Sequence, residues 1–408
     1  MNWDVIVIGA GPAGSTAATV LAQAGHRVAV LDRGPSPGFH LPETWAGGTL
    51  GLLAEIGVTG IASTFDLTTT VRLYNADGSF GVTLRLERAP GASSPAGVRL
   101  DRVRFDQLLV DHAIASGAVH YPGHHVLGVQ LDTVRPLISY TTAQGGRELT
   151  AELVVDASGK SALLGSTAQL RSTSPALDPR AAVFTHYQLT TPNPLTEPGT
   201  MTIIGLPAGY AFVIPISAER TSVGVVIGQR RAEVAPDPAT LFDQTVAESP
   251  VLAEIIAGAV RLLPFIPAMN SEYRCRRFAG PRFLLAGDAA AFTDPFFSTG
   301  LDIAVRSGVA AGRTAAELLG QPSEPARAAL REGYSNWLTT QLQEADSARY
   351  AAPLTGIAGQ LLLGLVDPHL PTVLPLAGLL QAAGRSAEVS PAQTEKTIRT
   401  ARDAFGEL

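Results

Sequence analysis

The stretch that decides the fold is Asp4-Val5-Ile6-Val7-Ile8-Gly9-Ala10-Gly11-Pro12-Ala13-Gly14, at the start of a chain of 408 residues. Four apolar β-forming residues lead into Gly9, and the segment from Ser15 to Ala24 has the composition of a helix. A strand, a glycine-rich turn and a helix in this order bring backbone N–H groups and a helix N-terminus to a pyrophosphate. The stretch therefore predicts a nucleotide-binding βαβ unit.

A second predicted strand, Arg27 to Leu31, ends in Asp32, close to the spacing at which a carboxylate accepts hydrogen bonds from ribose hydroxyls. The alternative is a βαβ unit whose glycines serve only tight packing, and it leaves Asp32 unexplained. The residues predicted to bind the nucleotide are Gly9, Gly11, Pro12, Ala13, Gly14, Asp32 and Arg33.

A second glycine-containing segment, Ala286-Gly287-Asp288-Ala289-Ala290, stands near the far end of the chain and is followed by Asp294-Pro295. It lies too far along the chain to belong to the same βαβ unit. Since two separated segments point to one nucleotide site, we predict that the cofactor is FAD and that its domain is discontinuous.

Composition limits the partners. The net charge of −6 argues against nucleic acid and against an anionic membrane surface. The single cysteine, Cys275, cannot form an internal disulfide, and no spacing suits a zinc or iron–sulfur site, so we expect no metal. Because the nucleotide strand begins at residue 4, we expect no signal peptide and a cytoplasmic location.

The middle of the chain predicts an antiparallel sheet inserted into the nucleotide domain. Four strand-like runs follow one another at residues 182–188, 200–204, 211–216 and 222–227. Short strands are also expected within 67–90, around a hairpin turn at Asn75-Ala76-Asp77-Gly78, and a helix near Thr240 to Ala257. The predicted domains are FAD binding at 1–66, 98–165 and 275–330, substrate binding at 67–97 and 166–274, and a C-terminal helical region at 331–408.

The segment Leu361 to Leu380 is apolar, but it does not predict a membrane span. Asp367, His369 and the prolines at 368, 371 and 375 interrupt any continuous helix through a bilayer. We expect helices that pack on the sheet, or a lid.

Four motifs carry a resemblance to a known family: Gly9-x-Gly11-x-x-Gly14, Arg102-x-x-Phe105-Asp106-x-x-Leu109, Asp156-Ala-Ser-Gly159, and Gly287-Asp288-Ala-Ala with Asp294-Pro-x-x-Ser298-x-Gly300. Over residues 1 to 320 the chain resembles the flavoprotein monooxygenases of the glutathione-reductase fold. Within them it is most similar to the branch of flavin-dependent halogenases and geranylgeranyl-reductase-like enzymes. The resemblance implies an α/β fold: a Rossmann-like FAD-binding domain, an inserted antiparallel substrate sheet and C-terminal helices.

The resemblance also assigns roles to single residues. Arg102 would reach the ribityl or phosphate region, unless it is a surface arginine at a helix start. Asp288 would accept from a ribityl hydroxyl, which is compatible with a helix-capping role. Asp156 would contact the cofactor or only cap its loop. The stretch with Pro295, Ser298, Thr299 and Gly300 would pass along the isoalloxazine ring.

Two departures from the halogenases bear on the chemistry. In the family, a lysine shortly after a Gly-Glu-Ser-like segment carries hypohalous acid to the substrate. Here Pro42-Glu43-Thr44 occupies that segment, no lysine precedes Lys160, and the other lysine is Lys396. The family's Trp-x-Trp-x-Ile-Pro stretch, which keeps substrate from touching the flavin, corresponds to Tyr210-Ala-Phe212-Val-Ile214-Pro215. A substrate could therefore come closer to the flavin than in the halogenases.

These departures favour a monooxygenase that transfers oxygen from a flavin hydroperoxide to an aromatic or other electron-rich group. The substrate would be a small molecule, a carrier-bound group or a tryptophan in a partner protein. NAD(P)H or a separate flavin reductase would supply electrons. The candidate acid–base residues are His40, Glu43 and His186, and the candidate pocket walls are Trp45, Tyr210, Phe212, Phe296 and Phe297.

Three alternatives stay open. An FAD-dependent reductase or dehydrogenase of a prenyl-like substrate would suit the apolar C-terminal segment. A halogenase would need a different carrier for the halide. A flavin-binding maturation protein would show little turnover of its own.

Overall fold

The computed structural model describes residues 3–34, 41, 43–45, 48–79, 81–85, 97–173, 180–207, 209–270, 272–292 and 299–350. They divide into two compact units. Unit 1 contains residues 1–64, 100–176 and 272–344, and unit 2 contains 65–99 and 177–271.

Three segments lie in unit 1 although the sequence suggested other domains for them, namely residues 166–176, 272–274 and 331–344. Residues 166–176 belong to unit 1 because β11 (Arg171–Thr173) pairs there with β18 (Tyr273–Cys275). Residues 331–344 belong to it as well, since the Tyr334 hydroxyl donates to the main-chain oxygen of Leu285 at 2.6 Å.

Unit 1 is built on a sheet with strand order β19-β20-β10-β1-β2-β7, in which β1 pairs in parallel with β10 and β2. Val5, Ile6 and Val7 of β1 are fully buried, as expected for a parallel strand covered on both faces. The strands of unit 1 are β1 Trp3–Ile8, β2 Val28–Asp32, β3 Thr44–Trp45, β7 Val119–Pro122, β8 His125–Gln130, β9 Leu137–Thr142, β10 Gly145–Asp156, β11, β18, β19 Ala279–Gly280, β20 Phe283–Leu285 and β21 Ala291–Phe292.

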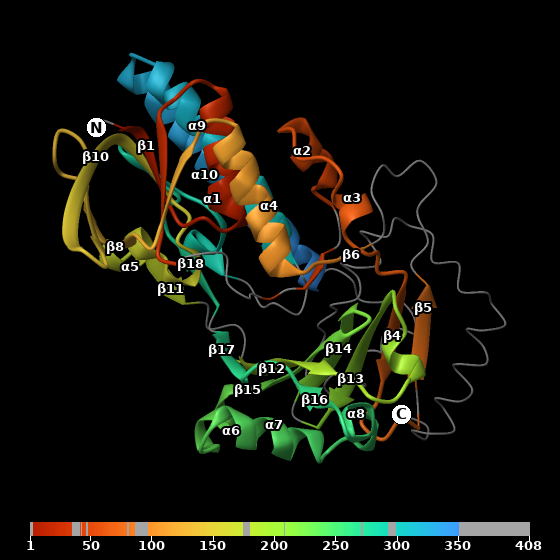
Figure 1. Ribbon diagram of the computed structural model, residues 1–408. Coiled ribbons are helices and arrows are strands. Elements are labelled where there is room, and N and C mark those ends of the chain that lie inside the picture. The colour runs from red at the N-terminus through yellow and green to blue at the C-terminus, as the bar shows by residue number, and fades with distance from the viewer. Residues whose placement is uncertain are drawn as a thin grey trace. The chain divides into compact units, whose positions relative to one another are not determined.

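The helices α1, α4, α9 and α10 gather on one side of this sheet (Figure 1). The helices α1 and α9 pack closely. A Cβ added at Gly308 of α9 would lie 2.2 Å from Thr16 Oγ1 of α1, so the contact leaves no room for a side chain there. The helices of unit 1 are α1 Pro12–Gln23, α2 Leu50–Glu55, α3 Ile61–Thr64, α4 Arg102–Ala115, α5 Leu163–Thr167, α9 Thr299–Gly320 and α10 Glu324–Tyr350, with 3-10 turns η1 Gly159–Ser161 and η3 Gly287–Ala289.

Unit 2 is a sheet of order β16-β12-β15-β14-β13-β4-β5, antiparallel except where β13 runs parallel to β4. Its strands confirm the predicted inserted sheet. The predicted turn joins β4 to β5, and Gly78 N donates to Asn75 O. The elements of unit 2 are β4 Thr70–Tyr74, β5 Gly81–Arg85, β6 Val98–Arg99, β12 Arg180–Gln188, η2 Pro194–Thr196, β13 Thr200–Leu206, β14 Gly209–Ser217, β15 Arg220–Gly228, α6 Gln229–Val234, α7 Pro238–Val246, α8 Pro250–Ile256, β16 Val260–Arg261 and β17 Ile266–Asn270.

The prediction of one helix from Thr240 to Ala257 is wrong, because α7 and α8 are separate helices. The Ser249 hydroxyl accepts from Leu252 N and caps α8, and Pro250 takes its first position, where no N–H is needed. Both helices pack on one face of the sheet, around a core that includes Tyr187, Val225 and Phe242.

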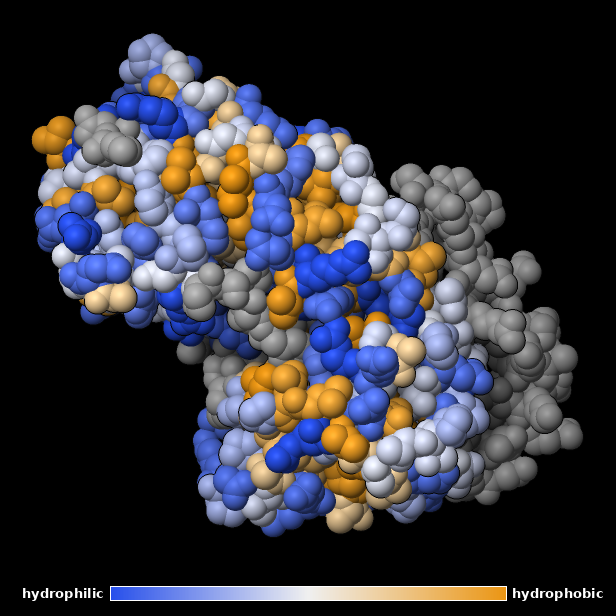
Figure 2. All heavy atoms as spheres, in the orientation of Figure 1, coloured by the Kyte–Doolittle hydropathy of each residue, from blue (hydrophilic) through white to orange (hydrophobic). Residues whose placement is uncertain are grey.

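Apolar side chains on the described surface are mixed with polar ones. Figure 2 shows hydrophobic and hydrophilic side chains intermixed around α4, where Val103 and Ile114 are exposed. Scattered apolar residues of this kind are ordinary on protein surfaces. No helix within the described ranges is long and apolar enough to cross a bilayer. The cytoplasmic location stays a prediction.

Candidate functional site

The turn after β1 depends on two glycines for packing. Gly9 has a φ of +97°, and an added Cβ would lie 2.4 Å from the main-chain oxygen of Ala157, which follows β10. A Cβ at Gly14 would lie 1.9 Å from the oxygen of Gly9. Since these neighbours are backbone atoms that cannot rotate away, any side chain here would displace β1 from β10 or α1 from the turn.

Gly11 differs from both, because a Cβ added there would meet nothing within 4 Å. Gly11 is the N-cap of α1, and no side chain caps the helix or places an acidic group in its first turn. An open approach to uncapped N–H groups suits a phosphate. The turn therefore fits the pyrophosphate of FAD.

Asp32 and Arg33 stand at the end of β2, the strand next to β1. The main-chain oxygen of Asp32 accepts from His124 N at 2.8 Å, which holds the backbone, while the residue is partly exposed. Asp32 thus stands at the strand end where a ribose ligand is expected, and its contact with a ribose stays a prediction. Arg33 is exposed.

A buried ion pair lies at the start of α4. The Arg102 guanidinium donates from Nε and Nη2 to the two carboxylate oxygens of Asp106, both at 3.0 Å. Both side chains are almost fully buried, so Arg102 is not the surface arginine of the alternative interpretation. The bidentate pair fixes the orientation of the guanidinium.

Asp288, in η3, is partly buried, and the charges of two cations act on its carboxylate. Burial raises its pKa to about 6, while the charges of Lys160 and Arg102 act in the opposite direction. Lys160 Nζ lies 4.0 Å from the centroid of the Phe292 ring. The Tyr273 hydroxyl donates to the main-chain oxygen of Asp288 at 2.7 Å and anchors η3. Asp288 and Arg102 thus lie in one electrostatic environment, as a shared ribityl or phosphate site requires.

Asp156 caps its own loop. One of its carboxylate oxygens accepts from Ser158 N at 3.0 Å and the other from Leu164 N at 2.8 Å. The residue is fully buried, and burial raises the pKa of its carboxyl group. Of the two roles considered from the sequence, the structure supports the loop cap rather than direct contact with the cofactor.

Trp45 is part of the core of unit 1. Its indole N–H donates to Asp302 Oδ1 of α9 at 2.8 Å, and the Thr49 hydroxyl donates to the same oxygen at 2.9 Å. Trp45 is 1% exposed, and its ring centroid lies 5.8 Å from that of Phe105. The indole N–H of Trp45 is thus satisfied within unit 1, and its place in a pocket wall stays a prediction.

Several predicted residues lie outside the described part of the chain: His40, Pro295, Phe296, Phe297 and Ser298. Thr299 and Gly300 begin α9. Glu43 is 1% exposed, and its main-chain oxygen accepts from Leu100 N at 2.8 Å.

Three other predicted residues, His186, Tyr210 and Phe212, lie on one face of the sheet of unit 2. The side chains of Tyr187 and Val225 belong to the core under α7 and α8, so their sequence neighbours point to the opposite face of the sheet. We call this the aromatic face, made by side chains of β12, β14 and β15: Phe184, His186, Tyr210, Phe212 and Ser222. His186, Phe212 and Tyr210 lie on this face in three successive rows, with Phe212 one row and Tyr210 two rows from His186.

Sequence reasoning missed four residues with clear structural roles. Asp106 could have been found, because it stands one helical turn after Arg102. Asp302 and Tyr273 carry no local signal, since their hydrogen-bond partners lie in other segments of the chain, and the position of Ser222 opposite His186 depends on strand register.

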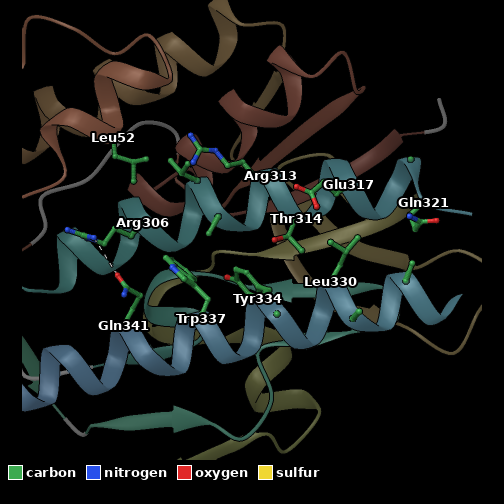
Figure 3. A pocket seen from close by; sticks show the side chains of 16 residues that line it. Leu52, Arg306, Arg313, Thr314, Glu317, Gln321, Leu330, Tyr334, Trp337 and Gln341 are labelled. Atoms are coloured by element: carbon green, nitrogen blue, oxygen red, sulfur yellow. Dashed lines mark hydrogen bonds between the residues drawn. The ribbon is translucent and has the colours of Figure 1, made fainter. Parts of the chain in front are cut away.

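A cavity of about 1000 Å³ lies elsewhere in unit 1, between α9 and α10 (Figure 3). Leu52, Arg306, Arg313 and Trp337 are among the side chains that line it. Of the predicted site residues that the structure describes, none lines this cavity.

Comparisons with known proteins agree with this fold. The family model described as "FAD binding domain" matches residues 2–335. The chain is 28% identical over 332 residues to the 1H-pyrrole-2-carbonyl peptidyl-carrier-protein chlorinase of Pseudomonas fluorescens, covering 75% of this chain and 74% of that protein. It is 29% identical over 399 residues to digeranylgeranylglycerophospholipid reductase 1 of Methanopyrus kandleri, covering 94% of this chain and 98% of that protein.

The fold of CmlS, a flavin-dependent halogenase of known crystal structure, is similar with a TM-score of 0.75 at 22% identity, covering 100% of this chain and 71% of that one. These findings confirm the predicted fold class and the resemblance to the halogenase and geranylgeranyl-reductase branch.

Proposed function

Because the chain belongs to the family defined by this FAD-binding domain and is a flavin-dependent oxidoreductase, we propose that it is a monooxygenase that hydroxylates an aromatic or similarly electron-rich substrate. One atom of O₂ enters a C–H bond of the substrate and the other leaves as water. NAD(P)H, directly or through a flavin reductase, supplies the two electrons.

One observation carries the choice between hydroxylation and halogenation. The chain has two lysines, Lys160 and Lys396, and neither occupies the segment where the resembling halogenases place their carrier lysine. Lys160 instead lies over the Phe292 ring, beside Asp288. An oxidant generated at the cofactor would then meet no lysine at the carrier position of the halogenases.

Bound FAD supplies the activation of oxygen, and the protein supplies binding and orientation. The turn at Gly11 receives the pyrophosphate, and Asp288 and Arg102 hold the ribityl chain and its phosphate. On the aromatic face, Tyr210 and Phe212 bind the ring of the substrate, and His186 exchanges a proton with its polar substituent.

The test uses full-length protein loaded with FAD and reduced under nitrogen. It is then mixed with ¹⁸O₂, chloride, bromide and either indole or p-cresol, and the products are analysed by mass spectrometry. We expect one ¹⁸O atom in the product and no halogen. Chlorinated or brominated product, or no ¹⁸O in any product, would contradict the proposal.

A second candidate is a reductase of a prenyl-like substrate. It is favoured by the similarity to the archaeal reductase over nearly the full length of both chains. The same reduced protein, given a geranylgeranyl lipid without oxygen, would then saturate the double bonds of that lipid.

A carrier-bound or protein-bound aromatic substrate would be distinguished from a free one by tethering the same aromatic group to a carrier protein or peptide and comparing the rates of hydroxylation. A maturation protein with little turnover would form no product in any of these experiments.

A further inference from the structure

The aromatic face contains a row of side chains that the sequence did not indicate. On β15, Val223 and Val225 point into the core under α7 and α8, so Ser222 and Gly224 point to the aromatic face. His186 of β12 is the direct partner of Ser222 in the sheet, and Phe184 is the partner of Gly224.

β14, the strand on the other side of β15, adds one residue to each of two rows of directly paired residues that run across the strands. Phe212 of β14 pairs with Gly224, and Ile214 pairs with Ser222. A Cβ added at Gly224 would lie 2.3 Å from the tip of the Phe212 ring and 2.8 Å from Phe184 Cβ. The Phe212 ring therefore lies across Gly224 next to Phe184, and forms an aromatic platform one row away from Ser222 and His186.

Ser222 is a polar group in an apolar place. The residue is 0% exposed, and its hydroxyl has no hydrogen-bond partner among the residues that the structure describes. Buried hydroxyls are nearly always bonded, because an unpaired one loses its water without compensation. An unpaired hydroxyl on this face therefore suggests a ligand.

Three other buried hydroxyls in the same unit are satisfied, whereas that of Thr68, on the segment before β4, is also without a partner among the described residues. Thr185 Oγ1, on the opposite face of β12, donates to Leu263 O at 2.7 Å. Thr202 donates to Leu195 O at 2.6 Å, and Ser249 donates to Ala76 O at 2.7 Å. Ser222 differs from these three in that its bonding capacity is still available.

We infer that Ser222 and His186 form a polar subsite for a ring O–H or N–H of the aromatic substrate, with the ring itself against Phe212 and Phe184. Residues two apart on a strand are about 7 Å apart, so a ring on one row extends its substituent to the next row. A hydroxyl both donates and accepts, as does a neutral imidazole, so the pair suits a phenol, an indole or a pyrrole.

This inference rests on the proposed function and narrows its substrate class. A prenyl chain has no polar group to offer Ser222, so the subsite does not favour the reductase candidate.

The test measures binding, not turnover, by isothermal titration calorimetry on the full-length FAD-loaded protein. The probes are two matched pairs: p-cresol and toluene, and indole and indene. We expect the wild type to bind p-cresol and indole at least about tenfold more tightly than their hydrocarbon partners. In Ser222→Ala this preference should fall to about twofold.

The matched control is Thr185→Val, which removes a buried hydroxyl from the other face of the neighbouring strand. It should keep the full preference. An unchanged preference in Ser222→Ala, equal binding of p-cresol and toluene by the wild type, or no p-cresol binding would each overturn the inference. A Ser222-dependent preference without oxygen transfer would reject only the proposed function.

Discussion

The nucleotide turn in unit 1 and the aromatic face in unit 2 are built in opposite ways. The turn is made of backbone, and its glycines at positions 9 and 14 are required because main-chain atoms approach within 3 Å of where a Cβ would stand. The aromatic face is made of side chains from three strands, where Phe212, Gly224 and Phe184 meet only through register. A backbone site tolerates almost no substitution, whereas a side-chain site can change its ligand while the sheet stays intact.

The largest effect should come from Gly14→Ala, compared with Gly11→Ala. The new methyl group at position 14 collides with the Gly9 oxygen, so we expect a loss of about 3 kcal/mol in unfolding free energy, together with loss of FAD. At position 11 the methyl group enters open space, so stability should change by less than about 1 kcal/mol while FAD affinity falls. Urea unfolding without FAD and quenching of flavin fluorescence measure the two quantities. Wild-type FAD affinity in Gly11→Ala would show that no phosphate approaches there.

Asp288→Asn tests the electrostatics of the cofactor site. The pKa of Asp288 is raised to about 6, so the buried carboxylate lowers the stability of the FAD-free protein above that pH, and the penalty vanishes as pH falls toward 4. We expect Asn to raise the unfolding free energy at pH 8 by at most about 3 kcal/mol, and by nothing near pH 4. Urea unfolding at both pH values measures the difference. A gain of the same size at both would show that Asp288 is not the group that titrates.

Trp45→Phe tests whether Trp45 belongs to the core. The change removes the indole donor to Asp302, and we expect a loss of about 2 kcal/mol, with a smaller loss for Thr49→Val, which removes the other donor. Thermal and urea unfolding measure both. The preference for p-cresol over toluene should be unchanged in each variant. A lost preference in Trp45→Phe alone would support its predicted place as a pocket wall.

The smallest effect should come from Ser222→Ala without ligand. Because its hydroxyl is unpaired, we expect the unfolding free energy to be unchanged or raised by up to about 1 kcal/mol. Thr185→Val loses a bonded hydroxyl and should lower it by about 1 kcal/mol. Equal losses in the two variants would show that Ser222 is bonded in solution.

The sequence predicted the structure best where residues adjacent in the chain set the local backbone structure. The turn from Gly9 to Gly14, the hairpin at Asn75 and the four central strands were all predictable, because each depends on residues adjacent in the chain. It was least informative where a partner is distant. Asp302, the partner of Trp45, is on α9, and neither residue indicates the other in the sequence.

By itself, the sequence determined that this is an FAD-binding α/β protein with an inserted antiparallel sheet, because glycine spacing and hydrophobic period are local properties that the backbone must obey. Only the tertiary structure decided which side chains meet. Register places His186 beside Ser222 and Phe212 across Gly224, and a shift of one residue would send each to the other face of the sheet.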